Sequence, residues 1–203
     1  MDRSPSVRNP GEGEAVQSGI LMVSPELLAA CRRGDRDAFE EVVRRTYRHV
    51  YTQALRIVGD RHEAEDVAQE AYLRVFRGLA GFRGEAQFET WLYRIVANAA
   101  ITYLRRKGRF GELVIDREDG PLEVAADVRV AEQAADREEL SRALAALPIS
   151  LRAVVVLKDV YGMPHKEIAE LLGTTEGAVK VRLHRARRRL KEQLFGTEDR
   201  DEV

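Results

Sequence analysis

The sequence predicts an all-α protein made of two small helical domains joined by a flexible acidic linker. Three observations support this fold class. Apolar residues recur every three to four positions through most of residues 24–195, which is the period of a helix with one buried face. The periodicity weakens over residues 108–136, where glycine and proline appear and eight acidic residues face three basic ones. Residues 164–194 read as a short helix, a tight turn and a basic helix, which together form a helix-turn-helix.

Length and composition are those of a globular protein in water, with 203 residues, 33% charged and 44% hydrophobic. The lone Cys31 excludes an intramolecular disulfide, and the four histidines lack zinc-ligand spacing, so we expect neither a metal nor a cofactor. The sequence has no apolar run near 18 residues and no signal-peptide core, which predicts a cytoplasmic protein without direct membrane insertion. Because no Ser/His/Asp arrangement or Walker-type loop is apparent, we expect no enzyme activity.

The first domain is expected to consist of four helices after a disordered tail at residues 1–23, which are rich in Gly, Ser, Pro and Glu. Ser24 and Pro25 have the residue types of a helix start, and Gly34 and Gly59 those of helix ends. The segment from Asp60 resembles a capping box. The expected helices are a short one from Ser24 that ends before Gly34, a long one from about Phe39 to Val58, and two further helices at 61–77 and 88–106, with Tyr47 and Phe76 on buried faces.

Two surfaces of this domain carry distinct chemistry. The helix at 61–77 exposes an acidic stripe formed by Glu63, Asp66, Gln69 and Glu70. A stripe of this kind is, on its own, more often a solvated helix face than a binding site. The turn before residue 88 and the helix that follows carry aromatic and basic residues, with no acid between Thr90 and Gly111: Phe82, Arg83, Gln87, Phe88, Trp91, Arg94, Asn98, Arg105 and Arg106. The same spacing also fits core positions for Phe88 and Trp91.

The second domain is expected to begin at residue 137, after the acidic linker. Its first helices should span residues 137–147 and 150–161. The run Val154–Leu157 alone would fit a strand, but the helical pattern on both sides and the lack of Gly or Pro inside favour a helix. An acidic tail at 196–203 should follow the last helix.

The helix-turn-helix has a local reason for each of its parts. Ile168, Leu171 and Leu172 give the first helix an apolar face, and Gly173 ends it. Thr174 and Thr175 are suited to accept hydrogen bonds from the amides at the start of the next helix, and Glu176 lies at the positive end of its dipole. Four residues form the core-facing stripe of that helix: Val179, Leu183, Ala186 and Leu190.

The rest of the last helix is expected to face outward, and it is strongly cationic. Seven Lys and Arg residues, Arg182 among them, lie between 180 and 191 with no acid. Phosphates attract such a helix, and the major groove of DNA admits it. The alternatives are a solvated basic helix and a helix for RNA or a membrane surface. Helical spacing predicts a DNA-reading face made of Lys180, Val181, His184, Arg185 and Arg188.

The two domains together resemble bacterial RNA polymerase sigma factors of the extracytoplasmic-function (ECF) group, in the sigma-70 family. Residues 24–107, with DRHEAEDVAQEAYLRVF and FRGEAQFETWLYRIVANAAITYLRR, look like region 2. Residues 137–195, with LPISLRAVVVLKDVYGMPHKEIAELLGTTEGAVKVRLHRARRRL, are similar to region 4. The linker is too short for the middle domain of larger sigma factors.

The resemblance implies a partner for each surface. It places the acidic stripe on the basic coiled coil of the polymerase largest subunit, and the aromatic and basic residues of region 2 on the minus-ten promoter element. The linker would thread the RNA exit channel of the core enzyme, whose partner surfaces include the second-largest subunit. The resemblance also implies an anti-sigma factor. The minus-thirty-five element would meet Thr175, Glu176, Lys180, Val181, Arg182, His184, Arg185 and Arg188, with Arg152 and Lys166 on the DNA backbone.

Three positions depart from the family pattern. Thr102 stands where Asp is usual, Ala178 where Thr is usual, and Val181 where Ser is frequent. Because the resemblance places Thr102 on the helix that meets promoter DNA, we expect it to bear on element preference, and Val181 would allow a base contact such as one with a thymine methyl group. Two competing functions are a self-sufficient helix-turn-helix transcription regulator and a DNA-processing enzyme. The acidic stripe and aromatic patch argue against the regulator, and the lack of an apparent nucleophile or metal-binding acids argues against the enzyme.

Overall fold

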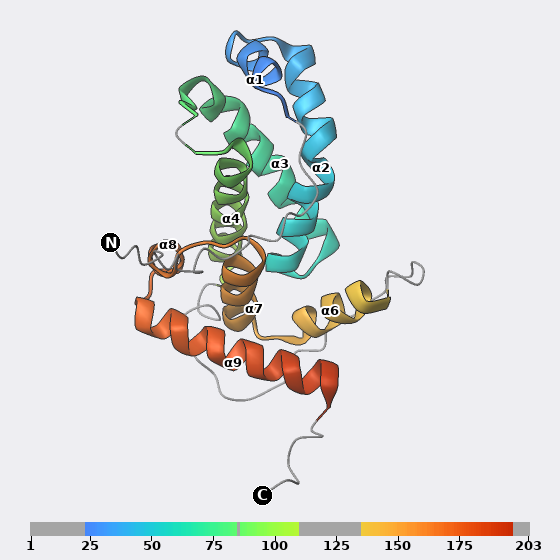
Figure 1. The fold of residues 1–203 in the computed structure, drawn as a ribbon, viewed down its shortest axis with the longest axis vertical. Coiled ribbons are helices and arrows are strands. Elements are labelled where there is room, and N and C mark those ends of the chain that lie inside the picture. The colour runs from blue at the N-terminus through green and yellow to red at the C-terminus, as the bar shows by residue number, and fades with distance from the viewer. Residues whose placement is uncertain (1–22, 85, 110–134, 197–203) are drawn as a thin grey trace, which may run out of the picture.

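The computed structural model describes residues 23–84, 86–109 and 135–196. Apart from Val23 and Gly196, the tails expected at 1–23 and 196–203 lie outside the described residues, as does most of the expected linker. Within the described ranges the regular structure is entirely helical, and the predicted all-α class with two helical domains is confirmed (Figure 1). None of the described helices is long and apolar enough to cross a membrane.

The helices of the first domain form a bundle in which α2 packs on α3 and α4 (Figure 1). Its elements are α1 (Pro25–Arg32), α2 (Arg36–Val58), α3 (Arg61–Gly78), a single 3₁₀ turn (Leu79–Gly81) and α4 (Phe88–Arg106). The second domain contains α6 (Ala135–Ala146), α7 (Ile149–Val155), a π-helical turn (Val156–Val160), α8 (His165–Leu172) and α9 (Glu176–Phe195).

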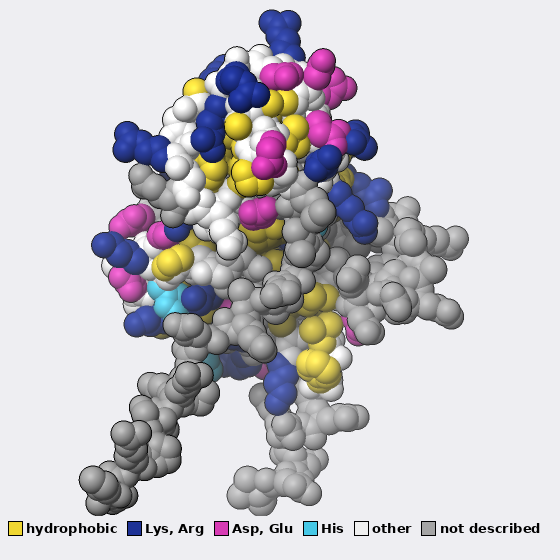
Figure 2. Space-filling model, turned by 45° about the horizontal axis from the view of Figure 1, so that its top comes forward, with side chains coloured by type: hydrophobic (Ala, Val, Ile, Leu, Met, Phe, Trp, Pro, Cys, Tyr) yellow, Lys and Arg dark blue, Asp and Glu magenta, His cyan; other side chains and the backbone are white. Residues whose placement is uncertain are grey.

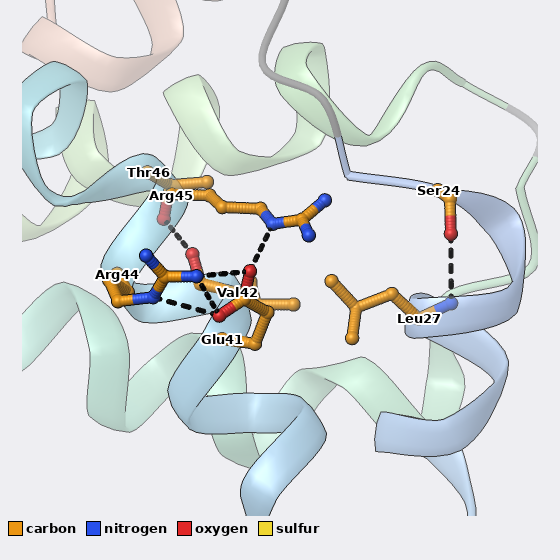
Figure 3. A network of polar contacts seen from close by, with 7 residues as sticks. All are labelled: Ser24, Leu27, Glu41, Val42, Arg44, Arg45 and Thr46. Atoms are coloured by element: carbon orange, nitrogen blue, oxygen red, sulfur yellow. Dashed lines mark hydrogen bonds and ion pairs between the residues drawn. The ribbon is translucent and has the colours of Figure 1, made fainter.

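Helix ends in the first domain are fixed by the residues that the sequence indicated. The Ser24 hydroxyl accepts a hydrogen bond of 3.2 Å from the Leu27 amide, as Figure 3 shows, and Asp60 accepts one of 2.9 Å from the Glu63 amide. Such caps satisfy amides that have no partner inside the helix. Gly59 ends α2 in the left-handed conformation at φ +85°, which glycine adopts without strain.

The exposed side of α2 is stabilised by a local charge network. Glu41 lies between the guanidinium groups of Arg44 and Arg45, one turn further along the helix (Figure 3). Hydrogen bonds from these two arginines hold the pKa of Glu41 below its usual range. On the buried side of the helix, the Thr46 hydroxyl donates to the Val42 carbonyl at 2.8 Å. Helix α2 therefore combines solvated ion pairs with a satisfied polar group in the core.

The phenol of Tyr72 is half-buried and packs against the core of the first domain. The Tyr72 hydroxyl lies 2.8 Å from the Thr46 hydroxyl, and burial raises the pKa of Tyr72 to about 12. An unfolded chain releases this proton near pH 10, so deprotonation favours unfolding between pH 10 and 12. We expect Tyr72 to contribute stability that is present below about pH 10 and falls by roughly 2–3 kcal/mol as the pH rises to about 12.

Urea unfolding of the wild-type chain and a Tyr72→Phe variant at pH 8, 10 and 11 tests this expectation. The variant should be less stable by about 1 kcal/mol at pH 8, because the hydrogen bond with Thr46 is lost. Its free energy of unfolding should then decline less steeply above pH 10. Parallel declines for the two proteins would contradict the assignment.

The second domain packs α7 and α8 on α9, which runs across the end of the molecule (Figure 1). The run Val154–Leu157 is helical and buried, as its flanking pattern predicted. The sequence did not predict that this helix widens into a π turn at Val156. Asp159 in that turn accepts two hydrogen bonds from Arg187 of α9, at 2.9 and 2.6 Å, and so joins the turn to the last helix.

Candidate polymerase and promoter interfaces

The acidic stripe lies on the solvent side of α3. Asp66 and Gln69 are exposed, while Glu63 and Glu70 are half-buried. The Tyr103 hydroxyl of α4 donates to Asp66 at 3.3 Å. The four side chains that the sequence grouped therefore share one helix face and reach its surface.

Basic residues of the same domain already neutralise part of this stripe. Arg109, just after α4, forms an ion pair of 2.9 Å with Glu63, and Arg74 forms one of 2.9 Å with Glu70. Asp66 and Gln69 thus keep the most solvent-accessible positions, and they lie on the side of α3 that faces the start of α2.

An apolar groove adjoins the acidic stripe, and the sequence analysis missed it. Tyr47 and Phe76 were expected in the core, but both are exposed, Phe76 by 56%. Phe76 contacts Phe39 edge to face, with ring centroids 5.0 Å apart. In Figure 2 apolar side chains reach the surface between charged ones over the end of the first domain that contains α1, at the top of the view. The groove has a volume of about 570 Å³ and is lined by Phe39, Val43, Tyr47, Glu65, Asp66, Gln69, Tyr72, Leu73 and Phe76.

The expected minus-ten residues divide into a polar surface and an aromatic cluster. Phe82 and Phe88 are buried, which for Phe88 is the core position that its spacing also allowed, so neither ring faces the solvent in this conformation. Trp91 is half-buried, with its ring centroid 5.0 Å from that of Phe82 and 5.8 Å from that of Phe88. A side chain at Gly78 would come within 3.2 Å of the indole, so glycine permits this packing. The exposed members are Arg83, Gln87, Arg94, Asn98, Arg105 and Arg106.

Polar side chains along α4 bond to the helix itself. Asn98 donates to the Arg94 carbonyl at 2.8 Å, and the Thr102 hydroxyl donates to the Asn98 carbonyl at 2.7 Å. Such local bonds are typical of threonine within helices. At Thr102, α4 therefore carries a short side chain whose hydroxyl is bonded within the helix.

The helix-turn-helix has the geometry that its sequence predicted. Gly173 ends α8 with φ +64°, and the Thr175 hydroxyl caps α9 by accepting from the Ala178 amide at 3.2 Å. Glu176 is exposed at the start of α9. Along the predicted reading face, Arg185 is half-buried and the others are exposed: Lys180, Val181, His184 and Arg188.

Two arginines expected at the DNA are buried instead. Arg182 is 4% exposed, and it shares its side of α9 with the buried residues Val179, three positions before it, and Ala186, four positions after it. Arg152 is 3% exposed, and its guanidinium donates to the carbonyls of Ile57 and Val58 in the first domain. Neither side chain reaches a DNA backbone in this conformation. Lys166, the other residue expected there, is exposed on α8.

The described residues contain no group of His, Cys, Asp or Glu arranged to hold a metal ion. Three exposed surfaces on these residues carry the features that the sequence or the structure singled out. They are the acidic stripe with its apolar groove, the polar face of α4, and the reading face of α9.

Comparison with known proteins identifies the family of the chain. Residues 42–110 match the model of sigma-70 region 2, and residues 137–190 match that of sigma-70 region 4. The chain is 34% identical to the ECF RNA polymerase sigma factor SigW of Bacillus subtilis, over 85% of this chain and 97% of SigW. It is 36% identical to the ECF sigma factor SigE of Mycolicibacterium smegmatis, over 79% of this chain but 64% of that protein.

A solved structure shares the fold. The sigma factor RpoE of Bartonella quintana, crystallised with the anti-sigma factor NepR, superposes with a TM-score of 0.56 and 23% identity, over 77% of this chain and 96% of RpoE. Region 2 precedes region 4 in the chain, as the sequence predicted, and both of these relatives are sigma factors. The chain therefore belongs to the extracytoplasmic-function sigma factors of the sigma-70 family, non-enzymatic proteins that bind RNA polymerase and direct it to promoters.

Proposed function

We propose that the three exposed surfaces divide the work of a sigma factor between polymerase binding, minus-ten recognition and minus-thirty-five recognition. The observation that carries this proposal is the row of four exposed side chains on α9, Lys180, Val181, His184 and Arg188, on a helix whose opposite side is buried. A cationic helix with one buried face is the form in which a helix-turn-helix enters the major groove.

The polymerase surface consists of the acidic stripe and the adjoining groove, which share Asp66 and Gln69. A partner that fits both would be a helix with basic side chains beside apolar ones. We assign this role to the coiled coil of the polymerase largest subunit. Phe76 supplies the main apolar anchor and Leu73 adds apolar area beside it, since a few large side chains, often aromatic, carry most of the binding energy of an interface.

The minus-ten surface is the exposed polar face of α4 with the edge of Trp91. All four polar residues are exposed, and we assign phosphate contacts to Arg105 and Arg106 and base contacts to Arg94 and Asn98. When the duplex opens, an unstacked base needs a flat partner, and stacking on an aromatic ring contributes about 1–3 kcal/mol. Trp91 is the partly exposed aromatic of the cluster, so we assign stacking to it and a supporting role to the buried rings of Phe82 and Phe88.

Two further partners follow from the family rather than from one surface. The acidic residues between 108 and 136 are proposed to run along the RNA exit channel and to approach the second-largest subunit. An anti-sigma factor is proposed to cover both domains, because the fold matches that of a sigma factor crystallised with one.

Fluorescence anisotropy of a labelled promoter fragment tests whether polymerase binding and promoter binding are coupled. The chain alone should bind the fragment weakly, and core polymerase should strengthen binding by about 100-fold or more, because specific and nonspecific affinities differ by at least that much. An Asp66→Lys variant should lose this gain, whereas Glu26→Lys, on helix α1 and outside both the stripe and the groove, should keep it. Tight binding by the chain alone would instead support the self-sufficient regulator.

A further inference from the structure

The aromatic cluster beside the minus-ten surface is held together by contacts among its three rings. Phe82 lies before the turn that leads into α4 and Phe88 lies after it, and their rings meet edge to face with centroids 6.0 Å apart. Trp91, one turn further along α4, packs against both rings. Phe82 and Phe88 are buried, whereas Trp91 is half-buried. The position of the accessible indole therefore depends on the two rings beneath it.

Two residues from other helices also contact this cluster. Gly78 ends α3 beside the indole, where a Cβ atom would come within 3.2 Å of the ring carbon Cζ2 of Trp91. Arg32 ends α1, and its guanidinium carbon lies 5.7 Å from the centroid of the Phe82 ring. A cation within about 6 Å of a ring centroid is attracted to the face of the ring. The cluster is thus bounded by α3 on the side of Trp91 and by α1 on the side of Phe82.

Helix α1 is well placed to restrain the cluster through this contact. It contacts the 3₁₀ turn Leu79–Gly81, which directly precedes Phe82, and Figure 1 shows α1 and the end of α3 at the same end of the first domain. Leu28 anchors α1 in the core. Because α1 is separate from α3 and α4, Arg32 restrains Phe82 independently of the ring contacts inside the cluster.

We propose that Arg32 is a positioning residue for promoter opening. It holds Phe82 against Phe88 and Trp91, and thereby keeps the accessible edge of the indole in place for an unstacked base. The proposal rests on the assignment of base stacking to Trp91 under the proposed function. A ring that must first be ordered binds a base less tightly, because the entropy lost on ordering offsets part of the stacking energy. Arg32 itself touches no base in this assignment and acts through the Phe82 ring.

Trp91 is the only tryptophan of the chain, so its fluorescence reports on the cluster in the free, full-length protein. Acrylamide should quench Trp91 more strongly in an Arg32→Gln variant than in the wild type, because the cation that restrains Phe82 is gone. Arg33→Gln is the matched control, since it makes the same change in charge at the next exposed position and should keep wild-type quenching. Arg32→Lys retains a cation and should restore most of the wild-type behaviour.

A double-mutant cycle with Phe82→Leu separates this role from a general effect on α1. Arg32 also lies in the last turn of α1, where a cation interacts favourably with the helix dipole. If Arg32 acts through the ring, Arg32→Gln should cause no further change in quenching once Phe82 is leucine. A further change in that background would overturn the positioning role. If circular dichroism shows that Phe82→Leu is unfolded, the comparison of Arg32→Gln with Arg32→Lys and Arg33→Gln decides.

Strand opening gives the functional readout. A 2-aminopurine base in the downstream element of a promoter fragment, bound with core polymerase, reports the ratio of open to closed complexes. Arg32→Gln should lower this ratio by about two- to fivefold, the range for one exposed cation–π contact. Affinity for core polymerase should stay within about twofold, since Arg32 lies outside the acidic stripe and the groove. The salt dependence of promoter binding should not change, because no phosphate contact is lost.

The combined results distinguish this proposal from the proposed function. Equal quenching in Arg32→Gln and the wild type would overturn the positioning role, and a weaker salt dependence would then make Arg32 a phosphate contact. Stronger quenching with an unchanged ratio of open to closed complexes would overturn the link between the cluster and promoter opening. If the wild-type chain opened no promoter with core polymerase, the proposed function would fail, while quenching would still show whether Arg32 holds the cluster.

Discussion

A Lys180→Glu variant should lose about 100-fold in transcription from the promoter of this sigma factor. Lys180 is exposed on the first turns of α9, where a recognition helix meets base edges and phosphates. The change removes a favourable contact of about 1–3 kcal/mol and places a negative charge beside the phosphates. Run-off transcription at fixed salt measures the loss.

Lys191→Glu provides the matched control for this variant. It makes the same change in charge on the same helix, about three turns further from the start of α9. Transcription should fall by no more than about threefold, because long-range repulsion from phosphates is screened beyond roughly 10 Å. Equal losses for the two variants would mean that α9 attracts DNA through overall charge and does not read it at Lys180.

A Phe76→Asp variant should lose at least about 100-fold in affinity for core polymerase. The ring is 56% exposed in the apolar groove and contacts Phe39. Burial of an aromatic anchor in an interface contributes about 2–4 kcal/mol, and aspartate would add a charge beside Asp66. The stability of the free domain should fall by only about 1 kcal/mol, the order of one aromatic pair. Titration of labelled core polymerase measures the affinity.

Phe195→Asp is the control for the groove. Phe195 is 71% exposed at the end of α9, outside the groove. It makes the same substitution without changing the proposed polymerase surface, so the affinity should stay within about twofold. Unchanged binding by Phe76→Asp would exclude the groove from the polymerase interface.

The sequence predicts the helices well because their ends are decided locally. Ser24, Asp60 and Thr175 cap helix starts through hydrogen bonds to amides three residues away, and Gly59 and Gly173 end helices through their own backbone conformation. These interactions need no information about distant parts of the chain. The boundary of α6 was less clear, since this helix begins at Ala135, within the expected linker.

Side-chain burial was harder to predict where it depends on contacts between distant segments. Helical spacing places Phe76 toward a core, but the gap between α2 and α3 is left open at that end. Arg152 was expected on the DNA backbone because the family resemblance implies it. No local pattern shows that carbonyls at the end of α2, 94 residues earlier, would accept hydrogen bonds from it. Arg182 was grouped with the outward-facing cations because of its charge, although helical spacing places it on the same side as the core residues Val179 and Ala186.

The candidate interfaces include residues whose exposure follows from local helical spacing and residues whose burial depends on contacts between distant segments. The reading face of α9 follows from helical spacing alone, so its exposed residues could be named in advance. The aromatic cluster could not be divided from sequence, because Phe82, Phe88 and Trp91 all lie near the same turn and differ only in how the turn folds back on α4. Which of these residues touch promoter DNA stays a prediction.

Run-off transcription from a library of promoter fragments, with sigma-free core polymerase and this chain, tests the central claim most directly. Transcripts should depend on the chain and should share two upstream elements at a fixed spacing, one for α4 and one for α9. Lys180→Glu should alter use of the upstream element without changing the downstream one. Transcripts that need only one element, or DNA binding that does not depend on core polymerase, would contradict the account.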